Sequence, residues 1–353
     1  MQTEIGGYLE LERFSGTLLH EKALKLSSGR ACLAYLIQQR GIRKILLPDF
    51  LCDAVRKTCE FYGVAVRTYE VGTDLRPVFF TKAGCPAGAD GSGRTGEAKT
   101  AMGTALADAG RTAECDLVAP EADEWLYLVN FYGQLTENEL KAYAERFPKL
   151  IVDNAQAYFA PALQEVDTLY TCRKFLGVAD GGFLYTDAPQ RTLPRDESHG
   201  RMGFVLGRFE RPAGEFFAEA SQNNDDLLFE PKQMSRLTEN LLRATDEEKI
   251  RQVRTENFNR LHAALGERNL LSLRPAEGAY AYPLMLENGE ETRRKLIARK
   301  IYVPTLWPNV LTEQPEDSTA VKLAREILPL PCDQRYGSEE MDAVIRAATE
   351  AEK

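Results

Sequence analysis

Apolar residues in this chain gather in short continuous runs, and these runs alternate with stretches in which they recur every three or four positions. KILLPDF at 44–50, LYLVNF at 126–131 and LIVD at 150–153 are continuous runs, typical of strands buried on both faces. RACLAYLIQQRG at 30–41 and CDAVRKTCEFYG at 52–63 have the spacing and the terminal glycine of helices. Strands and helices that alternate in this way predict a parallel sheet with crossover helices.

The central part of the chain places two charged residues at predicted strand ends. LIVD ends on Asp153, and Lys174 lies in a loop between two further predicted strands, DTLYTC at 167–172 and GFLYTD at 182–187. Alone, such an aspartate more often caps a turn and such a lysine is more often a solvated charge. Ligands of open parallel sheets bind at the carboxyl ends of the strands, so the pair predicts a site there.

Asp153 and Lys174 together have the chemistry that pyridoxal phosphate requires. The cofactor needs a lysine amine that binds it covalently and an acidic partner that keeps its pyridine nitrogen protonated. Gln156 adds an amide able to hydrogen-bond the phenolic oxygen of the ring. We therefore interpret Lys174 and Asp153 as candidate catalytic residues.

Ser28 and Gly29 directly precede the first predicted helix, and Arg30 lies in its first turn. A serine N-cap beside a glycine lets backbone N–H groups approach an anion, and the helix dipole adds to the attraction. The same residues also suit a helix that is simply well capped. The Asp153–Lys174 pair favours a phosphate cradle, with Arg30 either neutralising the phosphate or exposed to solvent.

Several segments resemble the DegT/StrS family, the fold type I pyridoxal phosphate aminotransferases that mostly aminate nucleotide-linked keto sugars. VDNAQA at 152–157 and TCRKFLGVADGG at 171–182 are similar to the family's EDAAQA and SFRKFFGVPDG segments. SSGRACLAYL at 27–36 resembles its phosphate-binding segment, and LVNFYGQ at 128–134 resembles its hxxGQ strand. IYVPTLWPNV and ILPLPCDQRY look like the end of its small domain.

The resemblance implies an α/β fold of the type I class, with a mainly parallel, seven-stranded sheet in a large domain and a smaller C-terminal α/β domain. We expect an N-terminal arm at 1–26, in which IGGYLELE alternates like a short edge strand, a large cofactor domain at 27–245 and a small domain at 246–353. Residues 83–116 have hardly a bulky apolar side chain and predict a flexible surface insertion. The resemblance also implies a homodimer with active sites at the subunit interface.

The resemblance assigns cofactor roles to further residues. Ser28, Gly29, Arg30 and Thr171 would hold the phosphate. In the family an aromatic residue stacks on the pyridine ring, yet alignment puts Cys52 at that position. The alternatives for ring stacking are Phe50, Phe131 and Tyr132. The arginine-rich segment at 191–211 predicts either a solvated loop or, as in the family, a contact to the cofactor phosphate or to a nucleotide diphosphate.

We therefore predict a pyridoxal phosphate-dependent aminotransferase that moves an amino group from an amino-acid donor, by analogy glutamate, to a keto acceptor. The family's usual acceptor is a nucleotide-linked keto sugar for polysaccharide or a glycosylated metabolite. Three alternatives stay open: a pyridoxal phosphate enzyme acting on a non-sugar keto compound, a non-catalytic relative that binds or regulates, and the same fold with another cofactor. No GxGxxG follows the first strand and no GxxxxGK occurs, so a dinucleotide site or a P-loop site lacks support.

Composition narrows the binding partners, the cellular location and the kinds of site that remain possible. A formal net charge of −9 argues against a nucleic-acid partner, although a local basic cluster still permits an anionic substrate. No run of about 18 apolar residues and no signal-like start occur, so we expect a cytoplasmic protein without a membrane partner. Seven cysteines without CxxC spacing and three scattered histidines predict reduced thiols and no metal.

Overall fold

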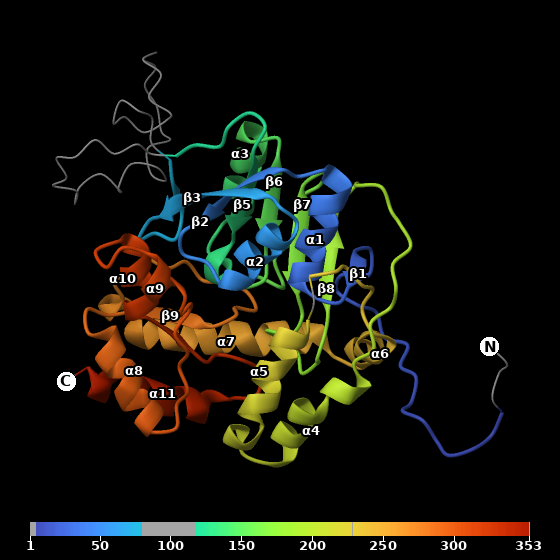
Figure 1. The fold of residues 1–353 in the computed structure, drawn as a ribbon. Helices are drawn as coiled ribbons and strands as arrows, with labels where there is room; N and C mark the ends of the chain where they lie inside the picture. Colours follow the sequence, from blue (N-terminus) through green and yellow to red (C-terminus); the bar gives the residue numbers. More distant parts are fainter. Residues whose placement is uncertain (1–4, 80–117, 228, 353) are drawn as a thin grey trace.

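The structure is a computed structural model that describes residues 5–79, 118–227 and 229–352. A twisted sheet with helices packed on its faces forms one part of the molecule, and the helix α7 (Glu247–Leu265) runs beneath it to the C-terminal part (Figure 1). The insertion predicted at 83–116 lies outside the described residues. Within the described ranges, no helix is both long and apolar enough to cross a membrane.

The described part of the large sheet has eight strands in the order β1-β8-β7-β6-β5-β2-β3-β4. The five strands from β7 to β3 are parallel, whereas β8, β1 and β4 pair antiparallel with their neighbours. The strands are β1 (Leu24–Leu26), β2 (Lys44–Pro48), β3 (Ala65–Val71), β4 (Pro77–Val78), β5 (Trp125–Val129), β6 (Leu150–Asp153), β7 (Asp167–Thr171) and β8 (Gly182–Tyr185). The predicted mainly parallel sheet is confirmed, with eight strands in place of seven.

Two helices of the large sheet begin at side-chain caps, and the cap at Ser28 is the one that the sequence predicts. Ser28 accepts a hydrogen bond from the N–H of Ala31 at 3.1 Å, and Thr136 forms a reciprocal capping box with Glu139. The elements concerned are α1 (Gly29–Arg40), α2 (Asp53–Phe61), the short 3-10 turn η1 (Phe131–Gly133) and α3 (Glu137–Arg146).

A helical segment leads from the sheet to the C-terminal part. It consists of η2 (His199–Arg201), α4 (Gly203–Glu210), η3 (Ala213–Phe216), α5 (Phe217–Asp226) and α6 (Arg236–Arg243). After α7, the C-terminal part contains a two-stranded antiparallel sheet flanked by helices: η4 (Gly266–Arg268), β9 (Tyr282–Met285), α8 (Gly289–Ala298), α9 (Val310–Glu313), α10 (Thr319–Glu326), β10 (Ile327–Leu330) and α11 (Ser338–Ala351).

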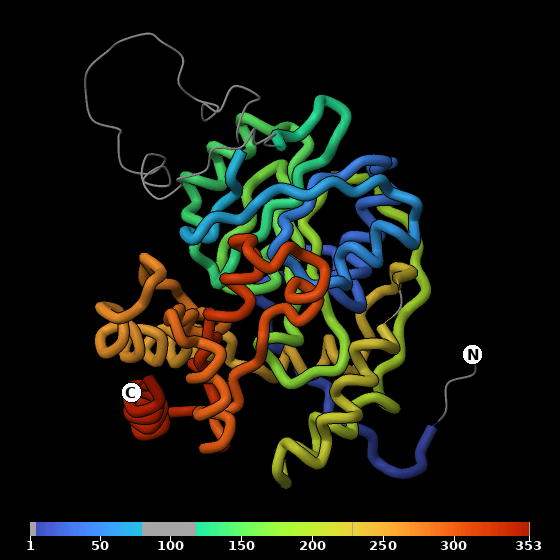
Figure 2. Tube along the Cα trace, turned by 60° about the vertical axis from the view of Figure 1, so that its left-hand side comes forward, coloured from blue at the N-terminus to red at the C-terminus, as the bar shows by residue number. Residues whose placement is uncertain are grey.

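The apolar core of the sheet continues into the C-terminal part. Val310 and Val321 belong to the same cluster of buried residues as Leu46 and Leu128 of the central strands. In Figure 2 the orange-red tube that precedes α11 accordingly lies against blue N-terminal segments, whereas the red helix α11 lies apart from them. A second cluster, which includes Phe258, holds α7 to β9, β10 and α11.

The N-terminal arm differs from the sequence prediction. The expected edge strand around IGGYLELE is wrong, because residues 5–23 contain no strand and the arm extends away from the sheet (Figure 1). The sheet edge is taken by β1 instead, where Leu24 pairs with Leu184 and Leu26 is fully buried. Burial of Leu26 fixes this register, whereas the alternating residues of the arm have no sheet face to pack on.

Candidate active site

Asp153 is the last residue of β6 and is almost completely buried. Its Oδ1 accepts a hydrogen bond from the Ala155 N–H at 2.7 Å, and its Oδ2 accepts one from the Tyr127 hydroxyl at 2.8 Å. Burial raises the pKa of Asp153, while the charge of Lys174 and both hydrogen bonds act in the opposite direction. Each carboxylate oxygen keeps a further acceptor position for a ligand.

Gln156 follows in the turn after β6 and is buried. Its Oε1 accepts a hydrogen bond from the Tyr132 N–H at 3.0 Å, which fixes the orientation of the amide. Its Nε2 is buried without a hydrogen-bond partner in the described part of the chain. Because an unpaired buried donor is costly, this amide suits an acceptor such as the phenolic oxygen of pyridoxal phosphate.

Lys174 lies in the loop between β7 and β8 and is half-buried. Its Nζ lies 5.6 Å from the centroid of the Tyr280 ring, which comes from the loop before β9. The loop is anchored at its next residue, since the Phe175 carbonyl accepts hydrogen bonds from Arg254 at 3.1 Å and Gln334 at 2.8 Å. The lysine is therefore positioned between the large sheet and the C-terminal part.

The charge of Lys174 acts on both Asp153 and Cys52. Cys52 is the N-cap residue of α2, and burial raises the pKa of its thiol. Asp153, Lys174 and Cys52 therefore come together at the carboxyl ends of β6, β7 and β2, as the parallel sheet predicted.

Phe50 and Phe131 lie in an aromatic cluster with Trp307. Both are buried, their ring centroids are 5.4 Å apart, and each packs on Trp307, at 4.9 Å for Phe50 and 6.1 Å for Phe131. This cluster joins the strand ends to the C-terminal part. Ring stacking by either phenylalanine stays a prediction, as does a contact from Cys52.

The predicted phosphate cradle lies where α1 meets the sheet. The Gly181 N–H donates to the Ser27 carbonyl at 2.6 Å, and a Cβ on Gly182 would lie 2.7 Å from the Ser28 carbonyl. β8 therefore needs glycine at this position to approach the helix N-terminus closely. Thr171, the fourth predicted phosphate ligand, donates from Oγ1 to the Gly181 carbonyl at 3.3 Å and lies next to this cradle.

The side chain of Arg30 turns from the cradle towards α5, where its Nη2 donates to the Asn224 carbonyl. Arg173 reaches the same asparagine, because its Nη2 donates to Asn224 Oδ1 at 2.5 Å. Gly29 has room for a Cβ, which would touch only Leu169 at 3.8 Å. The structure therefore places Ser28, Gly29 and Arg30 together and adds Arg173.

Sequence reasoning missed three residues of this site: Tyr127, Arg173 and Tyr280. A signal exists for Tyr127, which precedes Val129 by two positions on β5, and Val129 pairs with Asp153. Arg173 directly precedes Lys174, but its direction depends on where α5 packs. Tyr280 carries no local signal, since only the packing of the C-terminal part brings it to Lys174.

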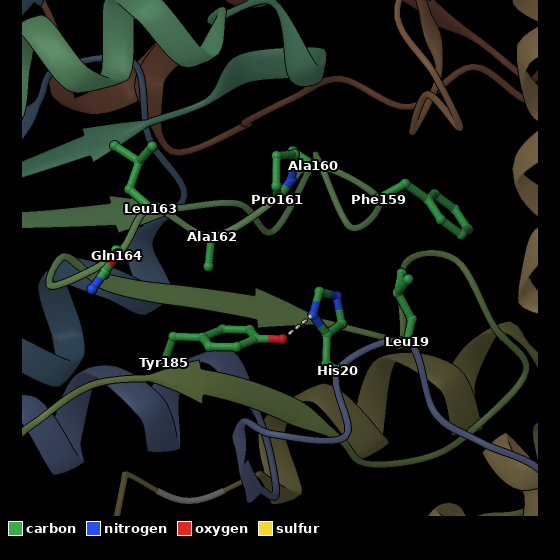
Figure 3. Close-up of a pocket in the computed structure, with 9 residues that line it drawn as sticks. All are labelled: Leu19, His20, Phe159, Ala160, Pro161, Ala162, Leu163, Gln164 and Tyr185. Carbon is green, nitrogen blue, oxygen red and sulfur yellow. Dashed lines mark hydrogen bonds between the residues drawn. The ribbon is translucent and has the colours of Figure 1, made fainter.

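A separate hollow of about 420 Å³ is lined in part by the connection between β6 and β7 (Figure 3). It is lined by Leu19 and His20 of the arm, the loop 159–164 and Tyr185. His20 is 3.2 Å from the Tyr185 hydroxyl through Nδ1, and burial lowers the pKa of its imidazole to about 4. None of the predicted site residues lines this hollow.

The residues present fit pyridoxal phosphate. The orphaned Nε2 of Gln156, the free acceptor positions of Asp153, the amine of Lys174 and the glycine-lined cradle at Ser28 provide a partner for each polar part of the cofactor.

No family model matches the sequence, and no curated protein matches it. Several solved structures do match this chain. The DegT DnrJ EryC1 StrS aminotransferase from Brucella abortus is 15% identical, with a TM-score of 0.57 over 93% of this chain and 85% of that one. The sugar aminotransferase CalS13 from Micromonospora echinospora is 13% identical, with a TM-score of 0.57 over 94% of this chain and 88% of that one. NtdA from Bacillus subtilis, with bound cofactor PMP, is 13% identical, with a TM-score of 0.58 over 93% and 73%.

Identities this low show the fold alone, but they do so over nearly the whole chain. The chain therefore has the α/β fold of the DegT/StrS aminotransferases, the type I fold that its motifs predicted.

Proposed function

We propose that this protein is a pyridoxal phosphate-dependent aminotransferase that takes an amino group from glutamate and transfers it to a nucleotide-linked keto sugar. The observation that carries the proposal is the meeting of Asp153, Gln156 and Lys174 at the carboxyl ends of adjacent strands. The fold supports the acceptor class, because similar structures include the sugar aminotransferase CalS13.

Bound pyridoxal phosphate would supply an aldehyde that takes up the amino group and a ring that withdraws electrons. Asp153 would accept a hydrogen bond from the protonated ring nitrogen, and the Tyr127 hydroxyl would keep this carboxylate ionised and oriented. Gln156 would donate its unpaired Nε2 to the phenolic oxygen.

Lys174 would hold the cofactor covalently and, once its amine is released, move the proton at the alpha carbon of the donor. Its place between β7 and Tyr280 suits this role, because the amine lies beside the aromatic ring and within electrostatic reach of Asp153. The anchors on Phe175 limit the movement of the loop that carries it.

We further propose that the active protein is a homodimer. Tyr8 on the arm is 99% exposed and Phe209 on α4 is 93% exposed, and Phe217 on α5 is also largely exposed. Large apolar side chains in such positions favour burial against a second copy of the chain. Sedimentation equilibrium at micromolar concentration would give twice the chain mass, whereas a monomer mass would contradict the dimer.

The visible absorbance spectrum tests the function. We expect a yellow band after incubation with pyridoxal phosphate, and bleaching of this band when glutamate is added. Lys174→Ala should abolish the band and turnover, whereas Lys322→Ala, at an exposed lysine on α10, should change neither.

Further outcomes separate the alternatives. After glutamate has bleached the band, the band could return with non-sugar keto compounds but not with nucleotide-linked keto sugars. That result would overturn the proposed acceptor class. A wild-type protein that never develops the band would favour a non-catalytic relative.

A further inference from the structure

The turn that follows β5 has a strained main-chain conformation. Tyr132, in η1, has a φ of 52°, and Gly133 has a φ of 69°. A left-handed conformation is unfavourable for a tyrosine, so it persists only where neighbouring groups hold it. The Tyr132 hydroxyl does not hold it, because this hydroxyl is buried without a hydrogen-bond partner in the described part of the chain. The turn is therefore held through its main chain.

Three consecutive main-chain oxygens of this turn accept hydrogen bonds from one side chain, that of Arg274. Its Nη2 donates to the Gly133 carbonyl at 2.5 Å and to the Leu135 carbonyl at 2.7 Å, and its Nε donates to the Gln134 carbonyl at 2.9 Å. Arg76 adds a longer hydrogen bond to the Gln134 carbonyl, at 3.3 Å. The carbonyls at the end of a helical turn have no donor within the turn, so the guanidinium group caps them.

Arg274 is also fixed to the turn through its own main chain. Its N–H donates to Gln134 Oε1 at 2.9 Å, and its carbonyl accepts from Gln134 Nε2 at 3.2 Å. The Gln134 side chain is buried, and Arg274 is half-buried. Five hydrogen bonds thus join the segment before β9 to the turn after β5, across 140 positions of the sequence.

The turn held in this way orients the amide of Gln156. The Tyr132 N–H donates to Gln156 Oε1 at 3.0 Å, and Nε2 of the same amide has no partner among the described residues. An amide has its acceptor oxygen and its donor nitrogen on opposite sides, so holding the oxygen decides where the nitrogen points. A rotation of the Tyr132 peptide would release the oxygen and let the amide turn.

We propose that Arg274 is a positioning residue: its guanidinium group keeps the turn in the conformation in which the Tyr132 N–H holds Gln156, with Nε2 directed to a ligand. Arg274 acts through Tyr132 and Gln156, without a contact of its own to that ligand. The identity of the ligand, the phenolic oxygen of pyridoxal phosphate, rests on the proposed function, whereas the hold of Arg274 on the turn does not.

Hydrogen exchange of the full chain without cofactor, measured by mass spectrometry, tests this hold on the turn. The four amides at 132–135 all donate hydrogen bonds, and Arg274→Gln should make their exchange about tenfold faster while α1 exchanges as in the parent. Arg294→Gln, at an exposed arginine of α8, is the matched control and should change neither segment. Unchanged exchange at 132–135 in Arg274→Gln would overturn the proposal, and so would an equal rise throughout the chain, as expected from general destabilisation.

Arg274→Lys separates the shape of the side chain from its charge. Lysine keeps the charge and most of the aliphatic stem, so this variant should fold as the parent does, but its single nitrogen cannot reach three carbonyls as the guanidinium group does. Exchange at 132–135 should therefore still rise, by less than in Arg274→Gln. Protection equal to that of the parent would show that charge alone suffices, and would overturn the role of the guanidinium group.

The bound cofactor supplies a second measurement. A hydrogen bond from Gln156 to the phenolic oxygen favours the ionised form of that oxygen. Gln156→Leu and Arg274→Gln should therefore each raise the pH at which the absorbance band of the loaded protein changes, by about half a pH unit or more. The double variant should shift no further than Gln156→Leu alone, because both substitutions act through one hydrogen bond. Additive shifts would mean that Arg274 acts by another route, and would overturn its positioning of Gln156.

The two measurements distinguish this inference from the proposed function. A parent protein that develops no absorbance band would overturn the pyridoxal phosphate assignment, and hydrogen exchange alone would then decide whether Arg274 holds the turn. If the parent develops the band but Arg274→Gln exchanges as the parent does, the proposed function stands and the positioning by Arg274 is overturned.

Discussion

Asp49 is the residue for which the structure gives the sharpest prediction on stability. It follows β2 and lines a small cavity together with Cys52 and Asn309. Burial raises its pKa to about 7, and the charge of Glu70 on β3 adds to the effect, although the Val71 N–H donates to its Oδ1 at 3.0 Å. The unfolded chain has the ordinary value of 3.8 for this group.

The sign of the pH dependence follows from these two values. Between about pH 4 and 7 the folded protein keeps the Asp49 proton that the unfolded chain has lost. The free energy of unfolding therefore falls as pH rises through this window, by about 1.4 kcal/mol per pH unit at most, and then levels off. By pH 8 the free energy of unfolding has fallen by about 4 kcal/mol in total. This value is an upper limit, because Asp49 is not completely buried.

Asp49→Asn removes this ionisation and keeps an oxygen for the Val71 N–H. We expect the variant to gain stability relative to the parent by about 2 to 3 kcal/mol between pH 5 and pH 8. Melting temperatures of both proteins across this range measure the gain, and Glu287→Gln at an exposed position before α8 is the control. A difference between the two proteins that stays constant from pH 5 to 8 would refute the reasoning.

Three more substitutions test the site and its supports. Tyr127→Phe leaves Asp153 with one hydrogen bond and should weaken cofactor affinity about tenfold, measured by fluorescence titration; unchanged affinity would show that this hydroxyl has no part in binding. Gly182→Ala should lower stability by about 1 to 3 kcal/mol, because the new Cβ meets the Ser28 carbonyl; an unchanged denaturation midpoint would contradict this clash. Arg254→Met should cost about 3 kcal/mol or more, because this buried side chain hydrogen-bonds four oxygens; a loss below 1 kcal/mol in urea unfolding would refute that value.

The parts of the fold that the sequence predicted are those set by local pattern. Ser28 caps α1 because its side-chain oxygen and the Ala31 N–H from which it accepts a hydrogen bond are three residues apart. Asp153 and Lys174 could be brought together from sequence because parallel strands carry their carboxyl ends to one edge of the sheet. The prediction of an edge strand in the arm was wrong, because alternation alone does not supply a neighbouring strand to pair with.

The parts that could not be predicted depend on contacts between distant segments. The contact between Arg173 and Asn224 joins residues 51 positions apart, and it exists only where α5 packs against the loop before Lys174. Tyr280 reaches Lys174 by the same kind of long-range packing. The partner of Gln156 Oε1 depends on Tyr132, whose backbone has a φ of 52° that no sequence rule assigns to a tyrosine.

The anchoring of the lysine loop bears on how chimeric proteins could be built from this fold. The Phe175 carbonyl is held by Arg254 on α7 and by Gln334 in the loop before α11. Replacing everything after α6 with the matching segment of another enzyme would therefore exchange both anchors along with Tyr280, whose ring lies beside Lys174. A functional chimera should keep the two anchors, or import its lysine loop from the same donor as its C-terminal segment.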